Sequence, residues 1–197
     1  MSDRQTLDVY ATKAKDYADL VETAGTDPMV QRFISHVSPR GTVLDIGCGP
    51  GFAAAAMAQA GLTAHAWDPV PEMLAIAATH PGVTTRQASY ADLIGQETYH
   101  GVWSNFSMLH TPLADWPTHM RAIHDALRAG GILHFGTKLG AGEARDSIGR
   151  MYSYMTEDAL MDLLTQTGFE VTYARTGEEA GLSGEIAPFI VLQATRG

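Results

Sequence analysis

The stretch of sequence that decides the fold is Val43-Leu44-Asp45-Ile46-Gly47-Cys48-Gly49-Pro50-Gly51. Its apolar first half is typical of a buried strand, and its alternate glycines lead into an alanine-rich segment. Glycine lets the backbone turn sharply and lets a ligand lie against peptide N–H groups, while the start of the next helix favours negative charge. We therefore expect a strand, a binding loop and a helix, with a nucleotide-like ligand over the loop.

Strands and helices alternate on the C-terminal side of this loop. The predicted strands cover residues 42–46, 63–67, 84–89, 101–106 and 132–139, and the predicted helices cover 52–60, 71–79, 116–127 and 157–167. Such alternation is typical of a mostly parallel sheet with helices on both faces. Two further strands, 169–175 and 188–196, follow without an intervening helix and are expected to pair as an antiparallel hairpin at the edge of the sheet.

On the N-terminal side of the loop, residues 7–21 have apolar side chains at helical spacing, with Tyr10 and Tyr17 on one face. Asp27 and Pro28 are a good cap and first-turn pair for a second helix up to residue 37. With 45% hydrophobic residues, the 197-residue chain can bury one sizeable core. We therefore expect a single domain over residues 1–197, with a helical cap (1–38) and an α/β core (42–197).

Composition narrows the classes of function. The formal net charge of -9 repels polyanions, so it disfavours nucleic acid and favours a small-molecule or cationic partner. No apolar stretch is long enough to span a membrane, and the N-terminus does not resemble a signal peptide, so a cytoplasmic location is expected. Cys48 is the sole cysteine, which excludes an internal disulfide and a multi-cysteine metal site. Composition predicts no particular subunit number.

Asp68 ends the strand that follows the glycine loop. Ligands of open parallel sheets lie beyond the carboxyl ends of the strands, where this carboxylate can accept two ribose hydroxyls. A dinucleotide is a poorer fit, because Phe52 occupies the sixth position of the G-x-G-x-x-G pattern and the closing hairpin supplies no second mononucleotide-binding half. A nicotinamide-dependent oxidoreductase remains a rival that NAD binding would reveal.

The glycine loop, with nearly the whole chain around it, resembles the class I S-adenosylmethionine-dependent methyltransferases that act on small molecules. The resemblance implies a three-layer Rossmann-like fold with a seven-stranded sheet. It also implies that S-adenosylmethionine binds with its methionine part over Gly47, Cys48 and Gly49, and that S-adenosylhomocysteine is the product. In this arrangement Asp45 orients the cofactor amino group, while Asp68, with Pro69, binds the ribose.

Further cofactor contacts follow from the same resemblance. Met73 is expected to flank the adenine, with ordinary core packing as an equal alternative. The family acid after the third strand is missing from Gln87-Ala88-Ser89-Tyr90, so Ser89 or backbone groups at Ala88, Ser89 and Tyr90 are expected to replace it. Tyr17 is expected to fold over the cofactor from the leading helix.

The fourth strand leads into Asn105-Phe106-Ser107-Met108-Leu109-His110. In similar small-molecule methyltransferases such a stretch lines the reacting centre, so Asn105 and Phe106 are expected at the cofactor and His110 at the acceptor. His110 is the catalytic candidate, because histidine can accept a proton near neutral pH. The alternative is that His110 only packs or hydrogen-bonds beneath the cofactor.

Acceptor binding is predicted for Arg145, Arg150 and Tyr152, which follow the fifth strand where this fold commonly carries a lid. Arginine and tyrosine suit an anionic or aromatic substrate. The alternative is a surface loop whose tyrosines cover the last helix. No metal is expected, because His119 and His124 lie five residues apart and do not share a helix face.

The predicted function is methyl transfer to an oxygen, nitrogen or sulfur atom of a small molecule. Asn105 is followed by Phe106 and Ser107 rather than by two prolines and an aromatic residue, which disfavours amino methylation of nucleic acid. Cytosine-carbon and arsenic methylation need cysteine chemistry that the single Cys48 does not supply. Two alternatives remain: a tRNA-base methyltransferase, and a cofactor-binding sensor or partner module without turnover.

Overall fold

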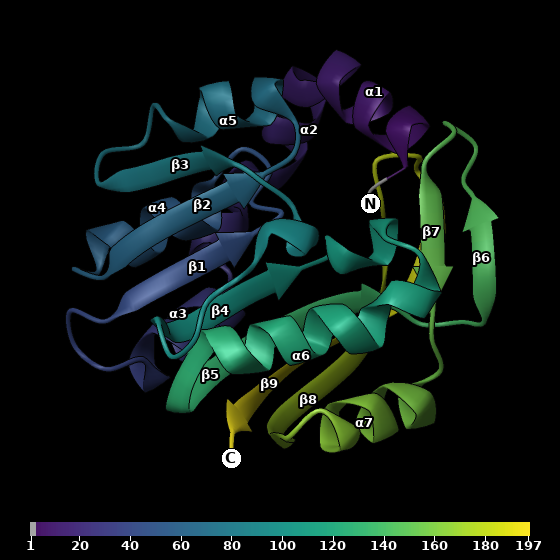
Figure 1. Ribbon diagram of the computed structural model, residues 1–197. Coiled ribbons are helices and arrows are strands. Elements are labelled where there is room, and N and C mark those ends of the chain that lie inside the picture. The colour runs from purple at the N-terminus through teal and green to yellow at the C-terminus, as the bar shows by residue number, and fades with distance from the viewer. Residues whose placement is uncertain (1–2) are drawn as a thin grey trace.

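The main sheet has seven strands in the order β3-β2-β1-β4-β5-β9-β8 (Figure 1). The computed structural model describes residues 3–197, so the first two residues of the predicted cap lie outside the described part. The strands are β1 (Thr42–Ile46), β2 (Thr63–Asp68), β3 (Val83–Gln87), β4 (Tyr99–Asn105), β5 (Leu127–Lys138), β8 (Phe169–Ala180) and β9 (Ile186–Arg196). The pairs among β1 to β5 are parallel, and β9 runs antiparallel to both β5 and β8. The predicted mostly parallel sheet and its closing hairpin are confirmed.

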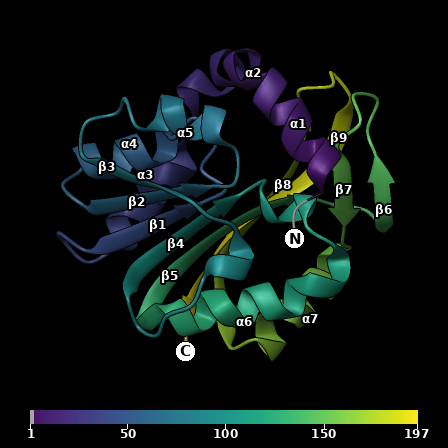
Figure 2. The same ribbon diagram turned by 45° about the horizontal axis from the view of Figure 1, so that its top comes forward.

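Helices cover both faces of the sheet and complete three layers (Figure 2). One face carries α3 (Pro28–His36) and α4 (Phe52–Gln59), whose Phe33 and Met57 are fully buried against it. The other face carries α6 (Trp116–Ala126) and α7 (Glu157–Gln166), which bury Ile123 and Leu164. A further helix, α5 (Pro71–Ala77), lies against β2 and β3.

The N-terminal segment forms two short helices rather than the single helix predicted over residues 7–21. These are α1 (Arg4–Thr12) and α2 (Ala14–Val21), and a short 3-10 helix, η1 (Glu22–Thr26), follows. The break falls at Lys13, whose φ of -106° and ψ of 20° are not helical. Asp3 caps α1 by accepting from the Thr6 amide, and Ala14 packs on Val70 and Met73. This corner places α1 and α2 across the carboxyl ends of the central strands (Figure 2).

A second, two-stranded sheet lies beside the main one, where the sequence predicted only a lid segment. It pairs β6 (Gly142–Arg145) with β7 (Met151–Tyr154) in antiparallel register. Asp146 organises the intervening turn, because its carboxylate accepts from the amides of Ile148 and Arg150. Both strands have four residues, and β6 is exposed throughout, so neither has the apolar alternation that reveals a strand in a sequence.

The β8–β9 hairpin is longer than predicted. β8 runs to Ala180 rather than residue 175, and β9 begins at Ile186 rather than residue 188. Because β9 pairs with β5 as far as Lys138 and Phe189, the hairpin tip continues past the carboxyl end of β5. The tip therefore reaches the edge of the sheet at which the glycine loop lies. The shorter elements η2 (Tyr90–Asp92), η3 (Met108–His110) and η4 (Leu113–Asp115) complete the described chain.

Candidate active site

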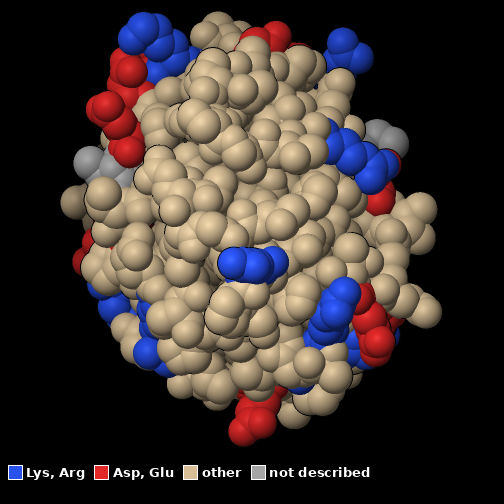
Figure 3. Space-filling model, turned by 90° about the vertical axis from the view of Figure 1, so that its left-hand side faces the viewer, with Lys and Arg blue, Asp and Glu red and all other residues tan. Residues whose placement is uncertain are grey.

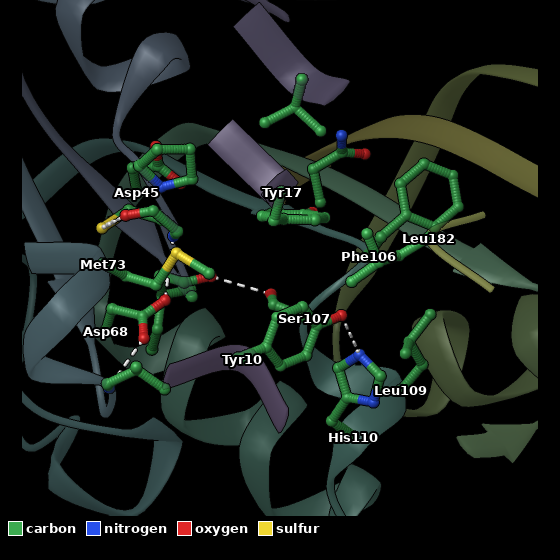
Figure 4. A pocket seen from close by; sticks show the side chains of 18 of the residues that line it. Tyr10, Tyr17, Asp45, Asp68, Met73, Phe106, Ser107, Leu109, His110 and Leu182 are labelled. Atoms are coloured by element: carbon green, nitrogen blue, oxygen red, sulfur yellow. Dashed lines mark hydrogen bonds between the residues drawn. The ribbon is translucent and has the colours of Figure 1, made fainter. Parts of the chain in front are cut away.

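A cavity of about 400 Å³ lies at the carboxyl ends of β1, β2, β4 and β5, beneath α1 and α2 (Figure 4). It brings together every residue predicted to bind cofactor or acceptor except Arg145. The predicted residues that line it are Tyr17, Asp45, Gly47, Cys48, Gly49, Asp68, Pro69, Met73, Ala88, Ser89, Tyr90, Asn105, Phe106, His110, Arg150 and Tyr152. In Figure 4 the two aspartates and Met73 lie at one end and His110 at the other, with Tyr10 and Tyr17 between them.

The glycine loop has the backbone conformation that only glycine adopts readily. Gly47, Gly49 and Gly51 have φ values of 71°, 51° and 80°. A Cβ on Gly47 would overlap the Ser107 side chain, and one on Gly49 would lie 3.3 Å from the Tyr17 ring. The amides of Gly47 and Cys48 donate to the Trp67 carbonyl over 2.7 and 3.0 Å, which ties the loop to β2. The loop therefore presents its backbone to the cavity, where a ligand can approach it closely.

Two buried carboxyl groups flank this loop. Asp68 accepts from the Gly49 amide over 2.9 Å and from the Val70 amide over 2.8 Å, using one oxygen for each. Burial raises the pKa of Asp68 to about 6 and that of Asp45 to about 8. Asp45 Oδ2 is buried and has no hydrogen-bond partner among residues 3–197. An unpartnered buried acceptor beside a cavity calls for a donor from a ligand.

These features fit the predicted cofactor. The ammonium group of a methionine moiety would satisfy the free oxygen of Asp45, and ribose hydroxyls would find the remaining lone pairs of Asp68. The glycine loop would hold the amino-acid part against bare backbone. Ionised carboxylates accept hydrogen bonds from such donors best. Ligand binding would therefore favour the ionised forms of Asp45 and Asp68, whereas burial favours the protonated forms.

Met73, Ser89 and Tyr90, which were predicted to contact adenine, all line the cavity. Met73 is 1% exposed and packs with Val70 and Ala14, so core packing and adenine contact are compatible roles. Both the amide and the hydroxyl of Ser89 donate to Asp92, which forms a capping box at η2. The Tyr90 hydroxyl is shared with Ser104 and Ser107 inside the protein. Tyr90 therefore offers the cavity its ring and backbone rather than its hydroxyl.

At the other end, His110 takes part in a chain of hydrogen bonds. His110 Nδ1 lies 2.7 Å from the Met151 carbonyl, which can only accept, so Nδ1 carries the proton. Burial lowers the pKa of His110 to about 4, which leaves Nε2 as an acceptor near neutral pH. The Tyr10 hydroxyl, 2.8 Å away, consequently donates to Nε2 and itself accepts from Arg150 Nη1 over 2.8 Å (Figure 4). The order of donors is therefore Arg150, Tyr10, His110.

A carboxylate fixes the position of the Arg150 side chain. It is 2% exposed, and its Nε and Nη2 donate to Asp146 Oδ2 over 2.9 and 2.8 Å. Tyr152 packs edge-on against His110, with ring centroids 4.7 Å apart. Arg145 does not line the cavity, because both of its terminal nitrogens donate to Asp3 at the start of α1. Its position therefore gives no support to the predicted contact with an acceptor.

Asn105, at the end of β4, is oriented by a residue of the neighbouring strand β5. His134 Nε2 lies 3.1 Å from Asn105 Oδ1, and the His134 ring stacks on Trp103 at 3.5 Å between centroids. Burial lowers the pKa of His134 to about 3, so its neutral ring donates to the Asn105 oxygen and leaves the amide NH2 for a ligand. Phe106 follows with a left-handed φ of 51°, a strained conformation of the kind that occurs at binding sites.

Several lining residues were missed by the sequence analysis. Lys138 ends β5, so the carboxyl-end rule that found Asp68 would also have found it. Tyr10 was noted on the helix face of Tyr17 but was not assigned to the site. Glu179 and Leu182 belong to the hairpin tip, which lies beyond the predicted end of its strand, so no local signal marks them.

Within the described chain, no group of three or more histidine, cysteine, aspartate or glutamate side chains is arranged to hold a metal ion. A search of residues 3–197 for helices long and apolar enough to cross a membrane finds none. On the molecular face shown in Figure 3, lysine and arginine side chains are scattered among acidic ones and do not gather into a patch. That face therefore offers no continuous basic surface.

Comparison with known proteins shows a match in sequence to a family model and a match in fold to solved structures. Residues 43–131 match a family model described as methyltransferase domain. No curated protein matches the chain. Among solved structures, it is similar to 1,6-didemethyltoxoflavin-N1-methyltransferase of Burkholderia thailandensis, solved with 1,6-didemethyltoxoflavin and S-adenosylhomocysteine bound. The two chains are 21% identical, with a TM-score of 0.79 over 98% of this chain and 87% of that chain.

Two further structures show the same fold. A methyltransferase from Methanosarcina mazei, named as S-adenosylmethionine-dependent, is 19% identical, with a TM-score of 0.74 over 86% of this chain and 97% of that chain. A possible histamine N-methyltransferase from Thermotoga maritima is 16% identical, with a TM-score of 0.68 over 98% of this chain and 100% of that chain. The matched segment contains the glycine loop, Asp45, Asp68 and His110. The family match therefore covers the part of the chain that carries the glycine loop, and the solved structures show that the chain has the fold of S-adenosylmethionine-dependent methyltransferases.

Proposed function

We propose that this enzyme transfers a methyl group from S-adenosylmethionine to an oxygen, nitrogen or sulfur atom of a small molecule. The observation that carries the proposal is a single cavity with two chemically different ends. One end has the glycine loop, Asp45 and Asp68, which suit the cofactor. The other has Tyr10 and His110, whose hydrogen bonds suit a second molecule that reacts beside it.

The walls of the cavity support a small acceptor. Tyr10 and Tyr17 cover it from the N-terminal helices, and Leu182 covers it from the β8–β9 tip. A covered cavity positions two small reactants and excludes water from between them. The Burkholderia thailandensis structure, with its bound 1,6-didemethyltoxoflavin, is in keeping with this size of acceptor. The net charge of -9 argues in the same direction against a polyanionic acceptor such as tRNA.

S-adenosylmethionine supplies an electrophilic methyl group on a positively charged sulfur. The residues of this chain accept the proton that a protonated nucleophile must lose. The Tyr10 oxygen accepts from Arg150 and donates to His110, so it has one lone pair left for the acceptor O–H, N–H or S–H. As this proton reaches Tyr10, the Tyr10 proton passes to His110 Nε2. His110 is then the proton acceptor, as predicted, but it acts through Tyr10.

Transfer of an isotopic methyl label tests the proposal. The protein would be incubated with methyl-labelled S-adenosylmethionine and a panel of small phenols, heterocyclic amines and thiols, and products would be identified by mass spectrometry. We expect label in one class of acceptor, with one S-adenosylhomocysteine formed for each methyl transferred. Binding of S-adenosylhomocysteine without label transfer to any member would instead favour a sensor or partner module without turnover.

A further inference from the structure

Lys138 is a buried cation that the steps above do not use. It ends β5, is 9% exposed and lines the cavity. Among residues 3–197, no hydrogen bond or ion pair reaches its ammonium group, and its closest aromatic contact is the Tyr152 ring, with a centroid 5.5 Å from Nζ. A charge that is buried without a partner is costly unless a ligand supplies the counter-charge.

The surroundings of Lys138 place a second cationic group beside it. A Cβ on Gly181, at the hairpin tip, would lie 3.3 Å from Lys138 Nζ and 3.9 Å from Arg150 Nη2. Both groups therefore face the same small region between β5, β7 and the tip. Burial and the neighbouring Arg150 charge lower the pKa of Lys138, as expected for a cation that lacks a close carboxylate.

The acidic side chains near Lys138 and Arg150 balance the charge of Arg150 but not that of Lys138, so this region can bind one further negative charge. Asp146 is committed to Arg150, whose Nε and Nη2 it holds from behind. Glu179 lines the cavity, but it is exposed and makes no ion pair with Lys138. Its more distant charge raises the pKa of Lys138, as do those of Asp146 and Glu185. Lys138 thus remains the one cavity-lining cation of the described chain without a bonded carboxylate.

We propose that the methyl acceptor carries a carboxylate, which binds Lys138 Nζ next to Arg150 and against the Tyr152 ring. This assignment rests on the proposed function and names the substrate class of the same site. A monoanion fits better than a phosphate, because Asp146 and Glu179 would oppose a second negative charge. The carboxylate would also fix the acceptor beside the Tyr10 hydroxyl, which Arg150 contacts. Lys138 is then the residue that selects anionic acceptors.

Calorimetry with a matched pair of probes tests this assignment. Benzoate and benzamide have similar shapes and differ in charge, and each would be titrated into protein saturated with S-adenosylhomocysteine. We expect benzoate to bind at least about tenfold more tightly than benzamide, and Lys138→Met to abolish that preference, because a charge-assisted hydrogen bond is lost. Glu179→Gln should tighten benzoate binding several-fold, since it removes an opposing charge.

The control is Lys15→Met, which removes an exposed lysine paired with Asp19 on α2 and should leave benzoate binding unchanged. Equal binding of benzoate and benzamide, no benzoate binding, or benzoate binding that survives Lys138→Met would overturn the assignment. Failure of the proposed function has a different signature. In that case no acceptor would take up the methyl label, whether or not S-adenosylhomocysteine binds, while the preference for benzoate and its loss in Lys138→Met would still report on the carboxylate site.

Discussion

The two ends of the cavity are built in different ways. The cofactor end comes mainly from one continuous stretch, in which the glycine loop, Asp45, Asp68 and Met73 follow one another along β1, β2 and the start of α5. The acceptor end combines Tyr10, His110, Lys138, Arg150 and the hairpin tip, which are far apart in the chain. Local backbone geometry shapes the first end, whereas tertiary packing shapes the second. The two should therefore respond to different perturbations.

The largest expected effect is at the glycine loop. Gly47→Ala should reduce S-adenosylhomocysteine affinity by a factor of about 100 or more, because the new methyl group overlaps Ser107 and the left-handed φ of 71° disfavours alanine. Gly61→Ala is the matched control, since Gly61 has a φ of 85° but open space around its Cβ position. Calorimetry on both variants separates an effect on the binding loop from the general cost of alanine at a left-handed position outside the cavity. Equal losses in the two variants would mean that the loop contact is unimportant.

The next largest effect is expected at the acceptor end. Tyr10→Phe removes the hydroxyl that donates to His110, so kcat should fall about 100-fold while S-adenosylhomocysteine affinity changes little. Tyr154→Phe is the control, because Tyr154 stacks on Tyr152 without lining the cavity. Steady-state kinetics with an acceptor from the label screen provides the measurement. A Tyr10→Phe enzyme with wild-type kcat would show that the proton leaves by another route.

The next effect, of about tenfold, is expected in the pH dependence of S-adenosylhomocysteine affinity, which reports on the cofactor end. Burial raises the pKa values of Asp68 and Asp45 to about 6 and about 8, so their contribution to the stability of the free protein is complete below the ordinary value of 3.8. That contribution is lost as pH rises through about 6 and 8. The cofactor prefers the ionised carboxylates, so S-adenosylhomocysteine affinity should instead rise, by about tenfold between about pH 5 and about pH 7 from Asp68 alone.

Calorimetric titration with S-adenosylhomocysteine across this pH range tests the sign. Asp45→Asn should flatten the part of the rise above about pH 6, whereas Asp16→Asn, at an exposed position on α2, should leave the curve unchanged. The same Asp45 variant should stabilise the free protein at alkaline pH, since it removes a buried charge whose Oδ2 has no hydrogen-bond partner among residues 3–197. Affinity that falls with rising pH would show that the cofactor does not need ionised carboxylates.

The smallest effect is expected at Arg145, just outside the acceptor end. Its pair with Asp3 is partly exposed and screened by solvent, so Arg145→Ala should lower the melting temperature only slightly. The KM for the acceptor should stay within about twofold of wild type, because the side chain does not line the cavity. Thermal unfolding and kinetics measure the two quantities. A large rise in KM would restore Arg145 to the acceptor site.

Much of the fold and of the cofactor end could be predicted because their signals are local. Alternating apolar runs revealed all seven strands of the main sheet, and the glycine pattern located the loop that Asp45 and Asp68 flank. The break at Lys13 was not visible, because the helical spacing continues across it. The β6–β7 pair was missed because each strand has four residues and β6 is exposed throughout.

The acceptor end was less predictable because its contacts are long-range. Arg145 and Arg150 looked equivalent in the sequence. In the β6–β7 pair, however, Arg145 points toward Asp3 and Arg150 toward Tyr10. Tyr10 reaches His110 only because α1 folds across the sheet, and the chain separation between these residues hides that contact. The role of the hairpin tip depends on how far β8 extends, which strand propensity alone does not define.

The most direct test of two separable ends is a titration of S-adenosylhomocysteine and NAD into wild-type protein, Asp68→Ala and His110→Gln. We predict one-to-one binding of S-adenosylhomocysteine but not of NAD to the wild type, loss of at least about a factor of 100 in Asp68→Ala, and near-wild-type affinity in His110→Gln. Binding of NAD alone, or S-adenosylhomocysteine affinity that survives Asp68→Ala, would contradict the assignment of the cofactor end. Equal losses in the two variants would contradict the separation of the ends.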